Sequence, residues 1–313
     1  MAILPTVRQL EVFVAVARLQ SFSRAAELTH MSQSALSQAV FQTERLLGTR
    51  LFERTKRSVK LAPAGQILLP RAERILANLE MAVAETRTNA DPGRGHITIA
   101  CLSLIATRVL PEAIQIFRTR YPYASILVRD DYLDRIPDFL KHADADLAVS
   151  SFVQPDPAIE FVPILEEKFY FIAPLAHPLA RKKRVVWRDL AGIDFVGMSQ
   201  NSSVRIAVDR ARIDAGIIQE TVYQVGRVTS VVEIVAQGGG VSVVPALALT
   251  DRRLRQQVHF RLMTDPEVRR TLGIMKLKGV PLSATASEFQ RILLATLRQK
   301  KPEKFPGIRI IPQ

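Results

Sequence analysis

A cluster of short polar side chains occupies one predicted helix, at Gln33, Ser34, Ser37 and Gln38. Amide and hydroxyl groups of this size fit the major groove of DNA and form hydrogen bonds with base edges. An isolated polar helix is more often an ordinary solvated surface, but the downstream residues favour DNA. Basic side chains there alternate with apolar ones, at Arg50, Arg54, Lys56, Arg57 and Lys60. That alternation is typical of a hairpin whose basic face contacts phosphates, which position a protein while base contacts specify the sequence.

The remaining reactive residue types do not form a catalytic or metal-binding pattern. Cys101 is the only cysteine, and a lone cysteine after an apolar strand is usually a small packed residue rather than a nucleophile. The five histidines have no metal-ligand spacing. Gly238-Gly239-Gly240 precedes a predicted strand and lacks the Lys-Ser/Thr of a phosphate-binding loop. The sequence therefore predicts no enzyme, metal or cofactor, with an enzyme built around Cys101 as the alternative.

Three short helices are predicted to position the polar cluster. Apolar residues recur at helical spacing from Val7 to Ala17. Ser21 and Ser23 can cap a second helix over 24–28, and Ser32 can cap a third over 33–47. The expected inner face of the third helix comprises Ala35, Leu36, Val40 and Leu47. Gly48 stands where a helix ends in the left-handed conformation. Two helices joined by the short turn 29–31 predict a helix-turn-helix, with Ser23, Arg24 and Ser32 as further candidate DNA contacts.

An ordered series of motifs resembles the LysR-type transcriptional regulators. It comprises residues 21–28 (SFSRAAEL), 31–37 (MSQSALS), 47–54 (LGTRLFER) and 61–65 (LAPAG), and the resemblance extends over roughly residues 4–300. Three positions depart from the usual family pattern. Thr43 replaces an apolar residue, Phe41 stands where the family often has a basic residue, and Ala62 replaces a capping threonine.

A long helical pattern over 63–91 predicts a linker. Its apolar side chains are spaced 4, 3, 4 and 3 residues apart, at Leu68, Ala72, Ile75, Leu79 and Ala82. That spacing indicates a coiled-coil seam, with an ordinary amphipathic core helix as the alternative. The family resemblance favours the seam, and a dimer would place two reading helices about one DNA turn apart.

After the breaker residues 91–95, short apolar runs alternate with helical patterns up to residue 301. The alternation predicts a parallel α/β sheet. Strands are expected at 96–102, 125–128, 146–149, 169–173, 195–197, 223–225, 241–244 and 272–277, and helices include 108–120, 136–142 and 284–297. The resemblance implies two subdomains that look like a periplasmic solute-binding protein, one over 95–167 and 268–300 and the other over 168–267. The proline-rich residues 302–313 are expected to form a loose tail.

Ligands of open α/β sheets bind beyond the carboxyl ends of the strands, which selects candidate effector contacts. Hydroxyl groups and free amides near helix N-termini suit carboxylates or other anions, whereas simple helix capping is the competing interpretation. The candidates are Cys101, Leu102, Ser103, Asp130, Ser150, Ser202, Ser203 and Thr229.

Charge and composition give weaker evidence about the partner and the location of the protein. The net charge of +13 favours an anionic partner such as nucleic acid. One cysteine, with no signal-peptide pattern, suits a reducing cytoplasm. No stretch reads as a membrane span, since Glu233, Gln237 and Pro245 interrupt the longest apolar segment.

Together these features predict an α+β multidomain chain. A winged helix-turn-helix over 1–62 is followed by the linker helix over 63–91, a two-subdomain α/β effector domain over 92–301 and the tail. The predicted function is sequence-specific transcriptional regulation, modulated by a small-molecule effector between the subdomains. Expected partners are double-stranded DNA, a second copy in a homodimer or homotetramer, and RNA polymerase. A solute receptor is the alternative, although it predicts a secretion signal. The sequence leaves the effector, the target genes and the sign of regulation open.

Overall fold

A computed structural model describes residues 4–54, 59–87, 93, 95–152, 154–218, 220–299 and 307–312. The chain divides into two compact units, residues 1–89 and 90–313, and each is described by itself.

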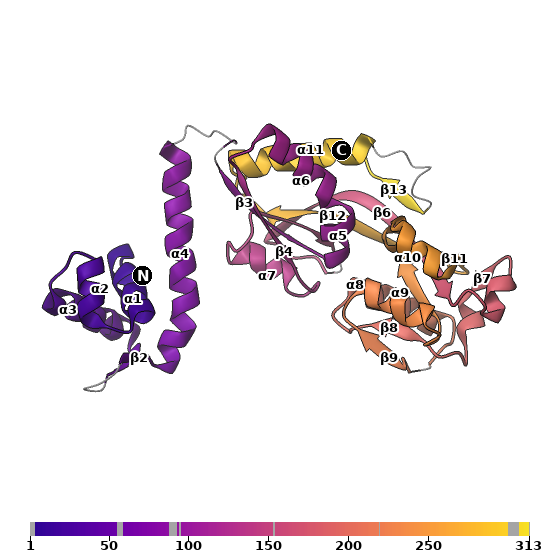
Figure 1. The fold of residues 1–313 in the computed structure, drawn as a ribbon, viewed down its shortest axis with the longest axis horizontal. Coiled ribbons are helices and arrows are strands. Elements are labelled where there is room, and N and C mark those ends of the chain that lie inside the picture. The colour runs from indigo at the N-terminus through magenta and orange to yellow at the C-terminus, as the bar shows by residue number, and fades with distance from the viewer. Residues whose placement is uncertain are drawn as a thin grey trace. The chain divides into compact units, whose positions relative to one another are not determined.

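The first unit is a helix-turn-helix with a hairpin and a long helix (Figure 1). Its elements are α1 (Val7–Leu19), α2 (Phe22–Leu28), α3 (Gln33–Leu47), β1 (Phe52–Arg54), β2 (Val59–Leu61) and α4 (Pro63–Arg87). Ser21 caps α2 by accepting a hydrogen bond from the Arg24 amide, and Ser32 caps α3 by accepting from the Ala35 amide. Ser23 lies inside α2 rather than at its cap, because the helix begins earlier than expected, at Phe22. Gly48 ends α3 in the left-handed region, with φ of 66°.

The core of the first unit joins the three helices to the hairpin. Leu36 and Val40 of α3 are fully buried, as is Phe13 of α1. The ring of Phe13 lies 5.5 Å from that of Phe52 in β1. Two residues expected on the inner face of α3, Ala35 and Leu47, are instead exposed. Thr43 fills part of that face, and its buried hydroxyl donates to the carbonyl of Ala39, which satisfies it within its own helix.

The hairpin is held against the end of α3. Strands β1 and β2 pair antiparallel, and one carboxylate oxygen of Glu44 accepts hydrogen bonds from the Leu51 and Phe52 amides at 2.8 and 3.2 Å. Gly65 leaves room for this arrangement, since a Cβ atom there would lie 2.2 Å from the carbonyl oxygen of Leu51. The hairpin is therefore the wing of a winged helix-turn-helix.

The long helix α4 is partly a core helix of its own unit. Ala72 is fully buried in the cluster around α1, Leu68 packs against that cluster, and Glu73 forms an ion pair with Arg18 of α1. This corrects the predicted seam, because Ala72 is covered by the same chain. Ile75 and Leu79 remain exposed, and the side chain of Ala82 lies outside the described residues.

The second unit contains three clusters of buried apolar residues, which define two lobes: two clusters belong to the first lobe and one to the second. The first lobe is built around β3 (His96–Cys101), β4 (Ser125–Asp130), β5 (Leu147–Ser151) and β12 (Arg269–Leu277), with α5 (Ser103–Arg108), α6 (Leu110–Arg120), α7 (Ile136–Lys141) and α11 (Ala284–Gln299). Helices α6 and α11 pack together through the rings of Phe117 and Phe289, whose centres are 5.5 Å apart. Both helices lie on the same side of the sheet (Figure 1).

The second lobe is built on the far end of β6 (Ile159–Ala173). It adds β7 (Val185–Val186), β8 (Val196–Met198), β9 (Tyr223–Val225), β10 (Ser242–Pro245) and β11 (His259–Thr264), helices α8 (Ser203–Asp214), α9 (Val228–Ala236) and α10 (Arg252–Gln257), and the 3₁₀ helices η2 (Pro178–Arg181), η3 (Trp187–Leu190) and η4 (Ala246–Thr250). Strand β6 runs through both lobes, because its first part pairs with β12 and its last part with β10 and β11.

Three expectations for the second unit are wrong in detail. The sheet is mixed rather than parallel: β3 is parallel to β4 and β5, whereas β12 is antiparallel to β5 and β6. The helix expected over 108–120 is present as α6 but begins at Leu110, with Pro111 in its first turn, and the separate short helix α5, which ends at Arg108, was not expected. The tail is not uniformly loose, since β13 (Ile308–Ile310) pairs with β6.

Candidate functional site

The polar cluster on α3 lies on the surface of the first unit. Gln33, Ser34 and Gln38 are exposed, and Ser37 is half-buried. The Ser32 hydroxyl caps the helix and lies 3.1 Å from that of Ser34. The N-terminal half of α3 thus presents amide and hydroxyl groups to solvent, as a helix that reads base edges must.

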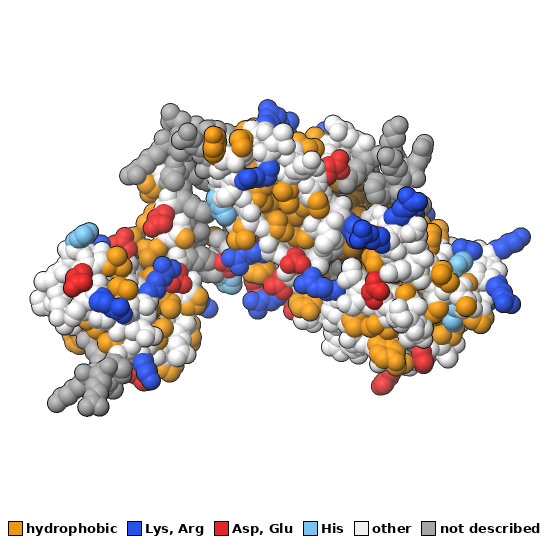
Figure 2. All heavy atoms as spheres, in the orientation of Figure 1, with side chains coloured by type: hydrophobic (Ala, Val, Ile, Leu, Met, Phe, Trp, Pro, Cys, Tyr) orange, Lys and Arg blue, Asp and Glu red, His pale blue; other side chains and the backbone are white. Residues whose placement is uncertain are grey.

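The structure describes only some of the basic side chains that are candidate DNA contacts. Lys60 is exposed on β2, as is Arg24 on α2, which donates to the carbonyl of Leu19. Lys56 and Arg57 lie outside the described residues, and for Arg54 only the backbone, in β1, is described. On the face that Figure 2 shows, Lys and Arg side chains are scattered among acidic and apolar ones, so the net positive charge does not by itself mark a DNA-binding surface there.

A cavity of about 280 Å³ opens between the two lobes of the second unit. Much of its wall is apolar, from side chains such as Leu102, Leu104 and Val228. Its polar lining includes Ser103, Thr107, Asp130, Asp131, Tyr132, Asn201, Ser202, Ser203, Arg227, Thr229 and Arg270. A largely apolar pocket with a few converging polar groups is typical of a small-molecule site.

The first turns of three helices line this cavity: α5, α8 and α9. Ser202 caps α8 by accepting a hydrogen bond from the Val204 amide, whereas the N-cap residues of α5 and α9, Leu102 and Arg227, provide no side-chain cap. The first N–H groups of a helix lack partners within the helix and carry partial positive charge. The helix ends in the cavity wall therefore offer backbone hydrogen-bond donors that carry partial positive charge.

Arg227 reaches across the cavity from the second lobe to the first. Its Nη1 atom donates to the Ser103 hydroxyl at 2.7 Å and to a carboxylate oxygen of Asp130 at 2.9 Å. Hydrogen bonds from Arg227 and Ser103 lower the pKa of Asp130, although partial burial opposes them. The carboxylate is consequently ionised at neutral pH, and the ion pair would lose its negative partner only in acid.

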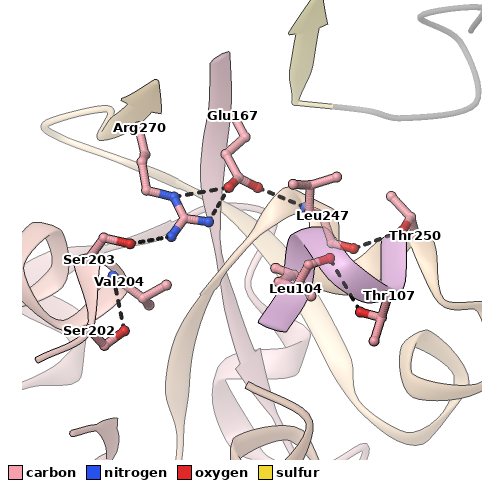
Figure 3. Close-up of polar contacts among 9 residues, drawn as sticks. All are labelled: Leu104, Thr107, Glu167, Ser202, Ser203, Val204, Leu247, Thr250 and Arg270. Carbon is pink, nitrogen blue, oxygen red and sulfur yellow. Dashed lines mark hydrogen bonds and ion pairs between the residues drawn. The ribbon is translucent and has the colours of Figure 1, made fainter. Parts of the chain in front are cut away.

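A second arginine of the cavity lining, Arg270 of β12, belongs to a buried network of polar contacts (Figure 3). Its Nε atom donates to Glu167 at 3.0 Å, its Nη2 atom contacts the same carboxylate oxygen, and its Nη1 atom donates to the Ser203 hydroxyl at 2.7 Å. The other oxygen of Glu167 accepts from the Leu247 amide at 2.9 Å. The network thus ties the paired strands β6 and β12 to α8 and to η4.

Six of the eight predicted effector residues line the cavity: Leu102, Ser103, Asp130, Ser202, Ser203 and Thr229. Cys101 and Ser150 do not, because both side chains are fully buried in strands of the first lobe. Burial raises the pKa of the Cys101 thiol to about 12, which removes the thiolate that a nucleophile or redox sensor needs.

The sequence prediction missed both arginines of the cavity lining, Arg227 and Arg270. Arg227 follows β9 and precedes α9, so the same carboxyl-end rule covers it, but only hydroxyl residues were selected there. No sequence signal marks Arg270, because its partner Glu167 lies on a distant stretch of the chain.

Within the described ranges, no group of three or more His, Cys, Asp or Glu side chains could hold a metal ion. No helix in the same ranges is both long and apolar enough to cross a membrane.

Comparison with known proteins identifies both parts of the chain. Residues 7–66 match the bacterial regulatory helix-turn-helix protein model of the lysR family, and residues 90–298 match the LysR substrate binding domain. The uncharacterised HTH-type transcriptional regulator YfeR of Shigella flexneri is 32% identical over 283 residues, which cover 90% of this chain and 91% of that protein.

Solved structures share the fold. A full-length OxyR variant from Pseudomonas aeruginosa aligns with a TM-score of 0.67, over 97% of both chains at 22% identity. The effector binding domain of QuiR in complex with shikimate aligns with a TM-score of 0.60, over 66% of this chain and 98% of that one at 22% identity. With an exposed polar face on α3, a wing and a cavity between two lobes, this chain belongs to the LysR family of DNA-binding transcriptional regulators with an effector-binding domain.

Proposed function

We propose that this regulator responds to a small organic anion held in the cavity between the lobes, and that it catalyses no reaction. We propose that the chain comprises a DNA-binding domain over 1–62, a linker helix over 63–91 and an effector domain over 92–301. We place the protein in the cytoplasm, because a bacterial transcriptional regulator acts on DNA there.

One observation carries the choice of an anion: the first turns of α8 and α9 both line the cavity, and α9 has no side-chain cap. Unpartnered amides and the helix dipole favour negative charge at such a point. The shikimate bound by the structurally similar QuiR domain is a carboxylate, in keeping with this class. Leu102, Ser103, Asp130, Ser202, Ser203 and Thr229 are the proposed effector contacts from the sequence, joined by Arg227.

The regulator function is tested by a gel-shift assay with the DNA upstream of the protein's own gene. A shift is expected at low salt, where phosphate contacts are strongest, and it should weaken steeply as salt rises. Calorimetry then tests coupling, since an effector that changes DNA affinity must have its own affinity changed equally by DNA. No shift at low salt would contradict DNA binding, and unchanged effector affinity on operator DNA would contradict coupling.

We propose that Ser23, Arg24, Ser32, Gln33, Ser34, Ser37 and Gln38 read bases or adjacent phosphates, and that Arg54, Lys56, Arg57 and Lys60 of the wing contact phosphates. Gln33→Ala should narrow the difference in affinity between operator and unrelated DNA, because each good base contact contributes about 1–3 kcal/mol of discrimination. Ser37→Ala should act in the same direction.

Lys60→Ala is the matched control for the reading helix. It should weaken binding to all sequences about equally. The slope of log affinity against log salt concentration should fall in magnitude by about one, because one phosphate contact is lost. Fluorescence anisotropy with both DNA sequences at several salt concentrations measures the two effects. A sequence-selective loss in Lys60→Ala, or a uniform loss in Gln33→Ala, would reverse these assignments.

We propose a homodimer, extended to a tetramer if further contacts form, through the exposed part of α4. Ile75, Leu79 and Val83 have 49%, 41% and 40% of their surface exposed and recur every four residues. Leu79→Glu should therefore shift the chain towards monomer in analytical ultracentrifugation, because a charge would be buried at the seam. Ala77→Glu puts the same charge on the opposite side of the helix and should leave the dimer intact. Equal behaviour of the two variants would exclude this helix face as the interface.

A further inference from the structure

The two cavity arginines differ in how many of their donors are already used. All three guanidinium nitrogens of Arg270 contact Glu167 or Ser203, so this residue has no free edge to offer a ligand (Figure 3). Its side chain is also 6% exposed. Arg270 is therefore part of the framework, although it lines the cavity.

Arg227 is in the opposite situation. Only its Nη1 atom is engaged, by Ser103 and Asp130, and its side chain is 59% exposed. Among the described residues, neither its Nε nor its Nη2 atom has a hydrogen-bond partner. These two nitrogens form one straight edge of the guanidinium group, the edge that binds a carboxylate through two parallel hydrogen bonds.

The hydrogen bonds that Nη1 makes also fix the position of the free edge formed by Nε and Nη2. Ser103 and Asp130 belong to the first lobe, whereas Arg227 precedes α9 in the second lobe, so the guanidinium group is held across the cavity. A side chain that is already oriented loses less conformational freedom when a ligand binds. Because Nη1 alone makes the contacts, a ligand can take the other edge without breaking the ion pair.

We infer that Arg227 is the residue that selects carboxylate effectors, which it binds through Nε and Nη2 while Ser103 and Asp130 hold it in place. This inference rests on the proposed anion site and names its ligand class: a monocarboxylate with a compact apolar body. The apolar body follows from the cavity of about 280 Å³ and its walls of Leu102, Leu104, Met198 and Val204.

The carboxylates in the cavity indicate that the effector has one negative charge rather than two. Asp130 forms an ion pair with one corner of Arg227, and Asp131 is a further carboxylate in the lining, which accepts a hydrogen bond from the Tyr132 amide at 2.7 Å. A second negative charge on the effector would face these groups without a second free cation among the described cavity residues. A single carboxylate is thus the better match to the one free guanidinium edge.

The test uses the full chain and two probes of nearly equal shape, benzoate and neutral benzamide. Isothermal titration up to about 100 mM of each probe is expected to show a preference of about ten-fold or more for benzoate, as charge-assisted bidentate hydrogen bonds require. Arg227→Gln should remove this preference. Arg227→Lys should retain part of the preference, because lysine keeps the positive charge but lacks the two parallel N–H donors of arginine.

Arg210→Gln provides the matched control, since Arg210 lies on α8 outside the cavity with 82% of its side chain exposed. It should bind both probes as the unchanged protein does. Thermal unfolding of each variant, without probe, establishes that the fold is kept.

The outcomes separate this inference from the proposed function. A preference for benzoate that survives in Arg227→Gln would overturn the role of Arg227 while leaving an anion site at the helix N-termini. Equal binding of benzoate and benzamide would overturn both the inference and the anion class. No binding of either probe at the highest concentration would also overturn the inference, because a free, oriented guanidinium edge beside an apolar wall must capture benzoate under those conditions.

Discussion

Glu167→Ala is expected to destabilise the effector domain by about 3–5 kcal/mol, because it leaves a buried arginine without its anionic partner. The side chain of Glu167 is fully buried, and that of Arg270 is 6% exposed. Without the carboxylate, the buried guanidinium keeps only the Ser203 hydroxyl, and the Leu247 amide loses its acceptor. An uncompensated buried charge explains most of the loss. Urea denaturation of the full chain, followed by tryptophan fluorescence, measures it, since Trp187 lies in the second-lobe core.

Two further variants test whether the loss comes from the buried charge: a control at the neighbouring residue and a double change that removes both charges. Glu166→Ala changes the neighbouring residue, whose partner Arg269 has 44% of its side chain exposed, and it should cost less than about 1 kcal/mol. The double change Glu167→Leu with Arg270→Met should recover much of the loss, because an apolar pair of similar size leaves no unpaired charge. Equal effects of Glu167→Ala and Glu166→Ala would show that the buried network does not hold the lobes.

Phe13→Ala is expected to destabilise the DNA-binding domain by about 3–5 kcal/mol. Phe13 is fully buried and contacts Phe52 of the wing, so its loss opens a cavity where α1 meets the hairpin. A domain of this size has little stability to spare, and DNA affinity should fall for every sequence. Hydrogen exchange of residues 7–19 in the full chain should become faster, whereas exchange in the effector domain should be unchanged.

Phe41→Ala is the control for the same residue type. Phe41 is 57% exposed on α3, so its removal should change stability by less than about 0.5 kcal/mol. Faster exchange in α1 after Phe41→Ala as well would mean that the domain is sensitive to any loss of a phenylalanine and that Phe13 has no special position.

Local rules predicted the first unit well. The bounds of α3, its Ser32 cap and the left-handed Gly48 follow from neighbouring residues, and the structure confirms each of them. The Ala35 and Leu47 positions were wrong because the inner face depends on where α1 and the wing pack, which helical spacing alone does not give. Thr43, an apparent departure, fits because its hydroxyl bonds within the helix.

Predictions that depend on contacts between distant residues failed more often. The Glu167–Arg270 pair joins strands 103 residues apart in the chain, so neither residue has a local signature. Ser150 satisfied the carboxyl-end rule but lies in β5, a strand buried along its whole length. Strand β13 was missed because a short segment beside prolines gives no periodic pattern. It is a strand through its antiparallel pairing with β6, which is distant in the sequence.

The order of the two lobes along the chain has a consequence for how the protein folds during synthesis. The second-lobe core uses mainly residues 169–263, a continuous stretch, whereas the first-lobe core needs β3 and β5 together with β12 and α11. The lobe whose residues emerge first from the ribosome therefore closes last, once its central strand β12 and the helix α11 have been made. Until then the apolar faces of β3 and β5 are uncovered, and a nascent chain stalled before residue 269 exposes them to chaperones and to aggregation.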